Sequence, residues 1–258
     1  MADDQFKRLR LLAGDDGVER LQNAFVIVAG LGAVGGYAVE ALARAGVGRL
    51  RLIDNDTVSL SNLNRQLFAL HSTVGRPKTE IAGLRVRDIN PACRTELRQS
   101  FINAESVPDL FSGDPDFVVD AIDSLNPKTD LIAWLHGNDV PFISSMGAAL
   151  RTDPRFISID KMEKVHHCRL AHMLRKRLRR RGVELDFPCV FSAQTRDGIP
   201  APRYDGESEQ LPGMGRDRAV MGSLPTITGI FGLTLANYVI CKITGLDKIG
   251  RKRSEERR

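Results

Sequence analysis

The sequence predicts an α/β protein built on a doubly wound, mostly parallel β-sheet. Apolar runs of strand length alternate with segments of helix length over the first 145 residues, and glycine-rich sequence follows the first run directly. The chain has 258 residues, of which 42% are hydrophobic, so it can bury the core that such a sheet requires. Because parallel strands are buried on both faces and joined by helices, this alternation favours right-handed βαβ crossovers.

The first half of the chain supplies the regular elements. Residues 24–29 (AFVIVA) are a continuous apolar run suited to a buried strand, and the alanine-rich residues 34–45 favour a helix. Pro77 and Pro91 bracket a later helix in positions that proline favours. The predicted series is a strand at 24–29, a helix at 34–45, a strand at 50–53, a helix from Pro77 to about Asn90, a strand at 117–122, a helix at 127–138 and a strand at 141–145.

The second half is less regular. We expect a strand at 155–160, a helix or loop over the basic residues 164–181, and a loop rich in glycine and proline at 196–216. Residues 219–241 carry no charge, but Pro225 and several glycines and threonines dilute the apolar run. We therefore expect a helix packed against the sheet and no stable membrane insertion, with peripheral membrane contact as the alternative.

Positive charge is concentrated in two segments. Residues 164–181 contain eight Lys or Arg and no acidic residue, and residues 251–258 contain five basic and two acidic residues, within a net charge of +5 for the chain. The remainder is therefore net acidic. Such clustering is typical of contact with a polyanion, because Lys and Arg neutralise phosphates. The alternatives are a solvated helix face for the first segment and a disordered tail for the second.

Cysteine usage and the N-terminal residues indicate a reducing compartment. No Cys-x-x-Cys pair and no apolar leader with a cleavage site are found, so we expect a cytoplasmic protein with free thiols and no structural zinc. The adjacent His166 and His167 have poor spacing for one metal ion on a helix. Cys189 could be reactive, although a buried structural thiol is the expected state.

The glycine motif predicts a nucleotide-binding turn in a Rossmann-like unit. Gly30, Gly32 and Gly35 follow the first strand and open a helix, where backbone N–H groups can approach phosphate. Asp54 ends the second strand 19 residues after Gly35, where a carboxylate can accept hydrogen bonds from ribose hydroxyls. Taken alone, these features fit any nucleotide, including NAD.

Charged residues further along favour ATP. Arg65 and Lys78 could stabilise a triphosphate that loses pyrophosphate, a need that an NAD dehydrogenase lacks. Asp123 follows the strand at 117–122, at the edge where open α/β sheets bind ligands, and its carboxylate could hold Mg²⁺.

In this order the residues resemble the adenylating domain of ubiquitin-activating enzymes and their bacterial relatives, the ThiF/MoeB-type superfamily. The resemblance covers Gln5 to about Ser145 and implies ATP and Mg²⁺ as cofactors. By this resemblance, Asp54 would bind the ribose and Asp123 would bind the metal. The phosphates would be contacted by Asn62, Arg65 and Lys78. The full nucleotide-binding set that it implies is Gly30, Gly32, Gly35, Asp54, Asn62, Arg65, Gln66, Lys78 and Asp123.

The resemblance also implies a homodimer. Arg8, with Gly14 following, falls where the superfamily has an arginine that reaches ATP in the neighbouring subunit. Together with Arg65, Lys78 and Asp123, it completes the predicted catalytic set.

Within the superfamily the chain is similar to the bacterial tRNA threonylcarbamoyladenosine dehydratases. The similarity rests on residues 11–14 (LLAG), 144–149 (SSMGAA) and 190–192 (VFS). Gln194 departs from the pattern, because an acidic residue often follows the Phe-Ser pair. The similarity implies tRNA as a partner, with a sulfur-relay protein as a further one. The basic residues expected to bind tRNA phosphates are Arg169, Arg175, Lys176, Arg177, Arg179, Arg180 and Arg181.

The implied division is an ATP-binding adenylating part at 1–150, a substrate-binding part of the same domain at 151–250 with irregular and helical structure, and a basic tail at 251–258. The implied reaction is ATP-dependent dehydration, with ring closure, of N6-threonylcarbamoyladenosine in tRNA through a carboxyl adenylate. The alternatives are adenylation of the C-terminus of a ubiquitin-like sulfur carrier, an NAD(P)-binding oxidoreductase, and a non-catalytic tRNA-binding module.

Overall fold

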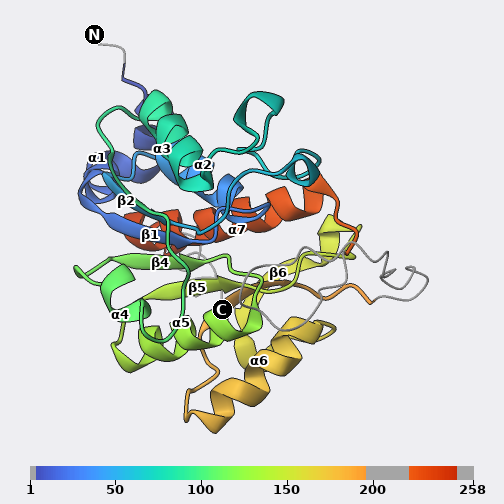
Figure 1. Ribbon diagram of the computed structural model, residues 1–258. Coiled ribbons are helices and arrows are strands. Elements are labelled where there is room, and N and C mark those ends of the chain that lie inside the picture. Colours follow the sequence, from blue (N-terminus) through green and yellow to red (C-terminus); the bar gives the residue numbers. More distant parts are fainter. Residues whose placement is uncertain (1–3, 196–220, 249–258) are drawn as a thin grey trace.

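A single seven-stranded sheet runs through the molecule (Figure 1). The computed structural model describes residues 4–195 and 221–248. The strand order is β3-β2-β1-β4-β5-β7-β6, and every neighbouring pair is parallel except β6 and β7, which are antiparallel. The strands are β1 (Phe25–Ala29), β2 (Arg49–Ile53), β3 (Arg94–Arg98), β4 (Phe117–Asp120), β5 (Phe142–Ser145), β6 (Ile157–Lys161) and β7 (Pro188–Ser192).

Helices cover both faces of this sheet (Figure 1). The helices are α1 (Lys7–Asn23), α2 (Gly35–Arg44), α3 (Lys78–Ile89), α4 (Val107–Leu110), α5 (Leu125–Gly137), α6 (Arg169–Arg180) and α7 (Pro225–Thr244). The core on one face is shared with α1, α2, α3 and α7, and the core on the other with α4, α5 and α6. The doubly wound, Rossmann-like architecture that the sequence predicts is therefore confirmed.

Strand β1 shows why apolar runs predicted this sheet. Val26 and Val28 enter one core while Phe25, Ile27 and Ala29 enter the other, so all five side chains are buried. A strand covered on both faces needs no polar alternation. The predicted strands at 24–29, 50–53, 117–122 and 141–145 correspond to β1, β2, β4 and β5 within a few residues.

Helix α7 accounts for the uncharged stretch near the C-terminus. Its length and composition would suit a membrane span, the one such helix among residues 4–195 and 221–248. Ile227, Phe231, Leu235 and Val239 enter the core beside α2, and a Cβ added to Gly232 would lie 2.2 Å from the carbonyl oxygen of Val34. Close packing of α7 onto α2 and the sheet confirms the expectation of a core helix.

The predicted loop at 196–216 and the basic tail at 251–258 lie outside the described residues. The basic segment at 164–181 does contain a helix, α6, which follows β6 and packs on α5. The predicted strand at 155–160 is β6, preceded by a short 3₁₀ turn at Pro154–Phe156.

Candidate functional site

The glycine turn joins β1 to α2 at the carboxyl edge of the sheet. Gly30 has φ +87°, and its N–H donates a 2.8 Å hydrogen bond to the carbonyl oxygen of Ile53 on β2. A Cβ on Gly30 would lie 2.9 Å from the carbonyl oxygen of Ala121, and one on Gly35 would lie 1.7 Å from the carbonyl oxygen of Gly30. The turn therefore needs glycine at these two positions, because its backbone packs tightly against the end of β4 and against itself.

No side chain caps the N-terminus of α2, where Val34 is the N-cap residue. The first N–H groups of a helix lack partners within it and favour negative charge. Space beside Gly32 is also open, because the nearest atom to a Cβ added there is Nε2 of Gln66 at 3.9 Å. This end of α2 fits a phosphate group.

Asp54 fastens the glycine turn to β2. Its Oδ2 accepts a 2.6 Å hydrogen bond from the N–H of Leu31, and its Oδ1 accepts a 2.8 Å bond from the N–H of Asp56. Burial raises the pKa of Asp54 above its ordinary value, while the nearby Lys78 charge opposes that shift. Each carboxylate oxygen has a second acceptor position, so the same side chain could also bind ribose hydroxyls.

Lys78 reaches the same region from α3. Its side chain is buried, and Nζ lies 2.8 Å from Oδ2 of Asp56. Lys78, Asp56, Asp54 and Leu31 therefore form a continuous chain of contacts that ends at the glycine turn. The sequence pointed to Lys78 but not to Asp56, whose position beside Asp54 was the available signal.

The segment at 59–66 carries the remaining residues expected to contact phosphate. Oδ1 of Asn62 accepts a 3.2 Å hydrogen bond from the N–H of Ser59, and its carbonyl oxygen accepts bonds from Arg65 and Gln66. The guanidinium of Arg65 donates to the carbonyl oxygen of Ser61 at 2.9 Å and to Oδ1 of Asn64 at 3.0 Å. Asn62 thus shapes a turn, and Arg65 is held by that turn in this conformation.

Asp123 is exposed and lies three residues after β4 ends. Ala121, two residues earlier, contacts Gly30, which brings this loop to the glycine turn. Among residues 4–195 and 221–248, no group of three or more His, Cys, Asp or Glu could enclose a metal ion. A single carboxylate still suits Mg²⁺, which keeps water and binds substrate phosphates alongside one or two protein ligands.

Arg8 lies at the opposite edge of the sheet. The ring of Phe6, at the start of α1, lies against Gly46, which precedes β2 at its amino end. Arg8 is exposed in the first turn of the helix. Arg8 follows Phe6 by two residues and so lies toward the amino edge of the sheet, whereas the glycine turn lies at the carboxyl edge.

Helix α6 presents a basic face to solvent. Ala171, Leu174 and Leu178 are buried, while the exposed basic residues are Arg169, Lys176, Arg177, Arg179, Arg180 and Arg181. Arg175 differs from the others, because Nη1 donates 2.5 Å and 3.3 Å hydrogen bonds to the carbonyl oxygens of Val165 and Met162. Its guanidinium fixes the segment before the helix.

This basic helix lies beside the Asp123 loop. Arg177 donates to Oδ1 of Asn126, three residues after Asp123, and Arg181 forms a 2.8 Å ion pair with Asp130 on α5. The exposed basic side chains of α6 therefore lie beside the start of α5, which follows the loop of Asp123.

The thiol of Cys189 is fully buried and lies 3.7 Å from Sδ of Met162. Burial raises its pKa far above the ordinary range. A protonated, inaccessible thiol supports a structural role. Gln194 is also structural, since Oε1 accepts hydrogen bonds from the N–H groups of Thr152 at 2.9 Å and Asp153 at 3.2 Å.

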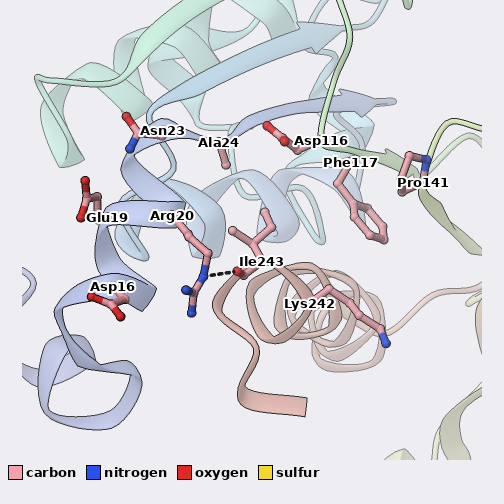
Figure 2. Close-up of a pocket in the computed structure, with 10 residues that line it drawn as sticks. All are labelled: Asp16, Glu19, Arg20, Asn23, Ala24, Asp116, Phe117, Pro141, Lys242 and Ile243. Atoms are coloured by element: carbon pink, nitrogen blue, oxygen red, sulfur yellow. Dashed lines mark hydrogen bonds between the residues drawn. The ribbon is translucent and has the colours of Figure 1, made fainter. Parts of the chain in front are cut away.

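A hollow of about 670 Å³ lies at the amino edge of the sheet (Figure 2). Arg20 crosses it and donates hydrogen bonds of 3.0 Å and 2.5 Å to the carbonyl oxygens of Ile243 and Thr244, at the end of α7. Ala24, Phe117 and Pro141 line it at or just before the starts of β1, β4 and β5. It is therefore separate from the glycine turn, and Arg20 links α1 to α7 there.

Known proteins resemble this chain over most of its length. The model of the ThiF family matches residues 4–256. A tRNA threonylcarbamoyladenosine dehydratase of Bacillus subtilis is 42% identical over 191 residues, which cover 74% of this chain and 75% of that protein. One from Escherichia coli is 34% identical over 245 residues and 90% of each chain.

A solved structure extends the comparison to the fold. The Escherichia coli tRNA N6-threonylcarbamoyladenosine dehydratase in complex with ATP is 31% identical, covers 95% of each chain and superposes with a TM-score of 0.82. Sequence and fold agree over the same span, and the chain belongs to the ThiF family.

Proposed function

We propose that the chain is an ATP-dependent tRNA threonylcarbamoyladenosine dehydratase. The observation that carries this proposal is the adjacency of two sites. The glycine turn, with Asp54 and Lys78, lies beside the loop of Asp123, and the basic helix α6 contacts α5 just after that loop. The Bacillus subtilis and Escherichia coli relatives carry the name of this activity, and the Escherichia coli enzyme binds ATP.

The first step would be transfer of AMP to the substrate. The threonyl carboxylate of N6-threonylcarbamoyladenosine attacks the α-phosphorus of ATP, the bond to the bridging oxygen breaks, and pyrophosphate leaves. Lys78 and Arg65 would stabilise the negative charge on the phosphates, and Arg65 would exchange its hydrogen bonds to Ser61 and Asn64 for phosphate oxygens. Gln66, Asn62 and the glycine turn would hold the nucleotide.

The second step would close a ring within the substrate. The carbamoyl group attacks the activated acyl carbon and loses its proton to solvent. The bond from that carbon to the AMP oxygen breaks, and AMP leaves with the oxygen that is lost formally as water. Because both reacting groups belong to one molecule, proximity supplies much of the acceleration. In the first step, Asp123 would hold a magnesium ion, whose positive charge would assist the departure of pyrophosphate.

The proposal includes a homodimer in which Arg8 of one subunit reaches the ATP of the other. The exposed position of Arg8 beyond the opposite sheet edge supports this arrangement. The proposal also includes a cytoplasmic location and, as a further partner, a sulfur-relay protein.

Helix α6 would bind the phosphates of tRNA. Arg169, Lys176 and Arg180 are seven and four residues apart, so they lie on one helix face. They span roughly 16 Å along the axis at 1.5 Å per residue. Recognition there would depend on backbone charge and shape.

Nucleoside mass spectrometry tests the activity directly. Purified enzyme is incubated with tRNA bearing N6-threonylcarbamoyladenosine, with and without ATP, and the nucleosides are analysed after digestion. ATP-dependent loss of one water from that nucleoside is expected, with release of AMP and pyrophosphate. Pyrophosphate exchange stimulated by a ubiquitin-like carrier protein, with no response to tRNA, would replace the proposal by the sulfur-carrier alternative. Tight NADH binding without ATP binding would indicate the oxidoreductase.

A further inference from the structure

A buried ion pair lies directly beneath the loop that carries Asp123. Asp120, the last residue of β4, and Lys128, on α5, are both fully buried, and Nζ of Lys128 lies 2.7 Å from Oδ2 of Asp120. The hydroxyl of Ser144 on β5 donates a 2.6 Å hydrogen bond to the same carboxylate oxygen. Burying two charges is costly, so a pair in this position requires a reason beyond general stability.

The same pair fixes the backbone of the loop. Nζ of Lys128 also donates a 2.8 Å hydrogen bond to the carbonyl oxygen of Ile122, and the other carboxylate oxygen of Asp120 accepts a 3.1 Å bond from the N–H of Ile122. Both backbone polar groups of Ile122, the residue before Asp123, are thereby held. A buried, fully connected polar network of this kind specifies one conformation.

The loop so held touches the nucleotide turn on one side and ends at Asp123 on the other. The carbonyl of Ala121 lies against Gly30, and Asp123 is exposed beyond it. We propose that Lys128, with Asp120 and Ser144, is a positioning residue that locks residues 121–123 so that Asp123 faces the metal bound to ATP. This inference rests on the proposed use of MgATP, but not on tRNA as the substrate.

The test compares three purified full-length variants. Lys128→Met removes both bonds made by Nζ. Lys128→Met combined with Asp120→Asn removes the loop clamp without leaving a charge unpaired. Arg51→Met is the matched control, because Arg51 is also buried, pairs with Glu96 at 2.8 Å, and donates to the carbonyl oxygens of Leu110 and Ser112 at 2.9 Å and 2.7 Å, away from the site.

Two measurements separate positioning from stability. Hydrogen–deuterium exchange reports on the amides of residues 121–124 without any ligand. Titration with ATP, in EDTA and then in excess Mg²⁺, gives the factor by which magnesium tightens ATP binding. In both Lys128 variants we expect loop exchange to accelerate at least about tenfold and the magnesium factor to fall about tenfold, with ATP affinity in EDTA nearly unchanged. The Arg51→Met control should lose stability but keep the wild-type magnesium factor.

A wild-type magnesium factor and wild-type loop exchange in a folded Lys128 variant would overturn the inference. If neither Lys128 variant folds, Ser144→Ala becomes the test of the positioning role. This variant removes one hydrogen bond to Asp120 and should lower the magnesium factor about threefold. No change in Ser144→Ala would then count against the proposal. A wild-type protein that binds MgATP normally but leaves the modified tRNA unchanged would contradict the proposed function alone, and one that shows no magnesium effect would contradict both.

Discussion

The backbone N–H of Leu31, inside the glycine turn, donates a 2.6 Å hydrogen bond to the buried carboxylate of Asp54, at the end of the neighbouring strand. This bond makes Asp54 part of the frame of the nucleotide turn as well as a candidate ligand for ribose. The structural role predicts a loss of stability when Asp54 is replaced, and the ligand role predicts a loss of ATP affinity.

Asp54→Ala should lower both stability and ATP affinity, whereas Asp54→Asn should lower ATP affinity with a smaller loss of stability. Alanine leaves the N–H groups of Leu31 and Asp56 unpaired, which costs about 1–3 kcal/mol. Asparagine can keep one of those bonds and cannot accept as many from ribose hydroxyls. Chemical denaturation and ATP titration of both variants check this expectation. An equal loss of stability in the two variants would contradict the role of Asp54 as an acceptor that holds the glycine turn.

Lys78→Met should slow adenylation far more than it weakens the fold. The partner of Lys78, Asp56, is 40% exposed and can be rehydrated when the amine is removed. The charge on the leaving pyrophosphate loses a stabilising cation, which is typically worth about 10²–10³ in kcat. Single-turnover formation of AMP measures the effect. The control is Arg76→Gln, two residues before Lys78, which removes an exposed ion pair with Glu80 and should retain nearly full turnover.

The sequence predicted the central strands well because those strands are buried on both faces. Strand β3 (RTELR) was missed, because it lies at one edge of the sheet and carries charged side chains. One of them, Glu96, forms ion pairs with Arg49 and Arg51 on the neighbouring strand β2. Strand β7 was missed as well, because a five-residue run opened by Pro188 gives little local signal. Its position between β5 and β6 is set by long-range pairing.

The sequence predicts those residues of the candidate site whose positions depend on the order of neighbouring elements along the chain. The glycine turn and Asp54 follow from the order of strand, turn and helix along the chain. Lys128 could not be distinguished from a surface lysine in the sequence, because its burial results from Asp120 on another element. For the same reason, Arg175 could not be separated from its exposed neighbours on α6.

Neutralising one face of α6 should weaken tRNA binding and its dependence on salt. The variant Arg169→Gln, Lys176→Gln, Arg180→Gln removes three exposed cations from one stripe of the helix. The slope of log affinity against log salt should fall by about 0.7–0.9 for each tRNA phosphate that the variant no longer neutralises. Binding titrations at several salt concentrations measure it. The control variant removes equal charge at the far edge of the sheet by changing Arg87, Arg94 and Arg98 to Gln. These residues lie on or beside strand β3, and the slope should stay unchanged.

Burial of Cys93 should make the protein less stable in alkaline solution. Desolvation raises the pKa of Cys93 to about 11, from an ordinary value of 9.0. The folded state therefore retains a proton that the unfolded chain loses above pH 9, so stability from this group is full below pH 9 and declines as pH rises to 11. The free energy of unfolding, measured by chemical denaturation between pH 9 and 11, should decline less steeply with pH for Cys93→Ala than for the wild type. Identical declines would show that the thiol ionises equally in both states.

Arg8 provides the test of the dimer, because it lies toward the amino edge of the sheet and the glycine turn of its own chain lies at the carboxyl edge. Arg8→Ala should reduce turnover strongly while ATP affinity changes little, since an interaction made in the transition state affects kcat. That result alone would not show which subunit uses the arginine. A mixing experiment does so.

Arg8→Ala and Asp123→Ala subunits, each inactive alone, are mixed in equal amounts and allowed to exchange. If Arg8 acts on the partner's ATP, each mixed dimer has one intact site, built from Asp123 of one subunit and Arg8 of the other. Random exchange should then restore about a quarter of wild-type turnover, because half of the dimers are mixed and half of their sites are complete. If Arg8 acts within its own chain, every subunit stays defective and mixing restores nothing. The recovered activity therefore distinguishes a shared site from two independent ones.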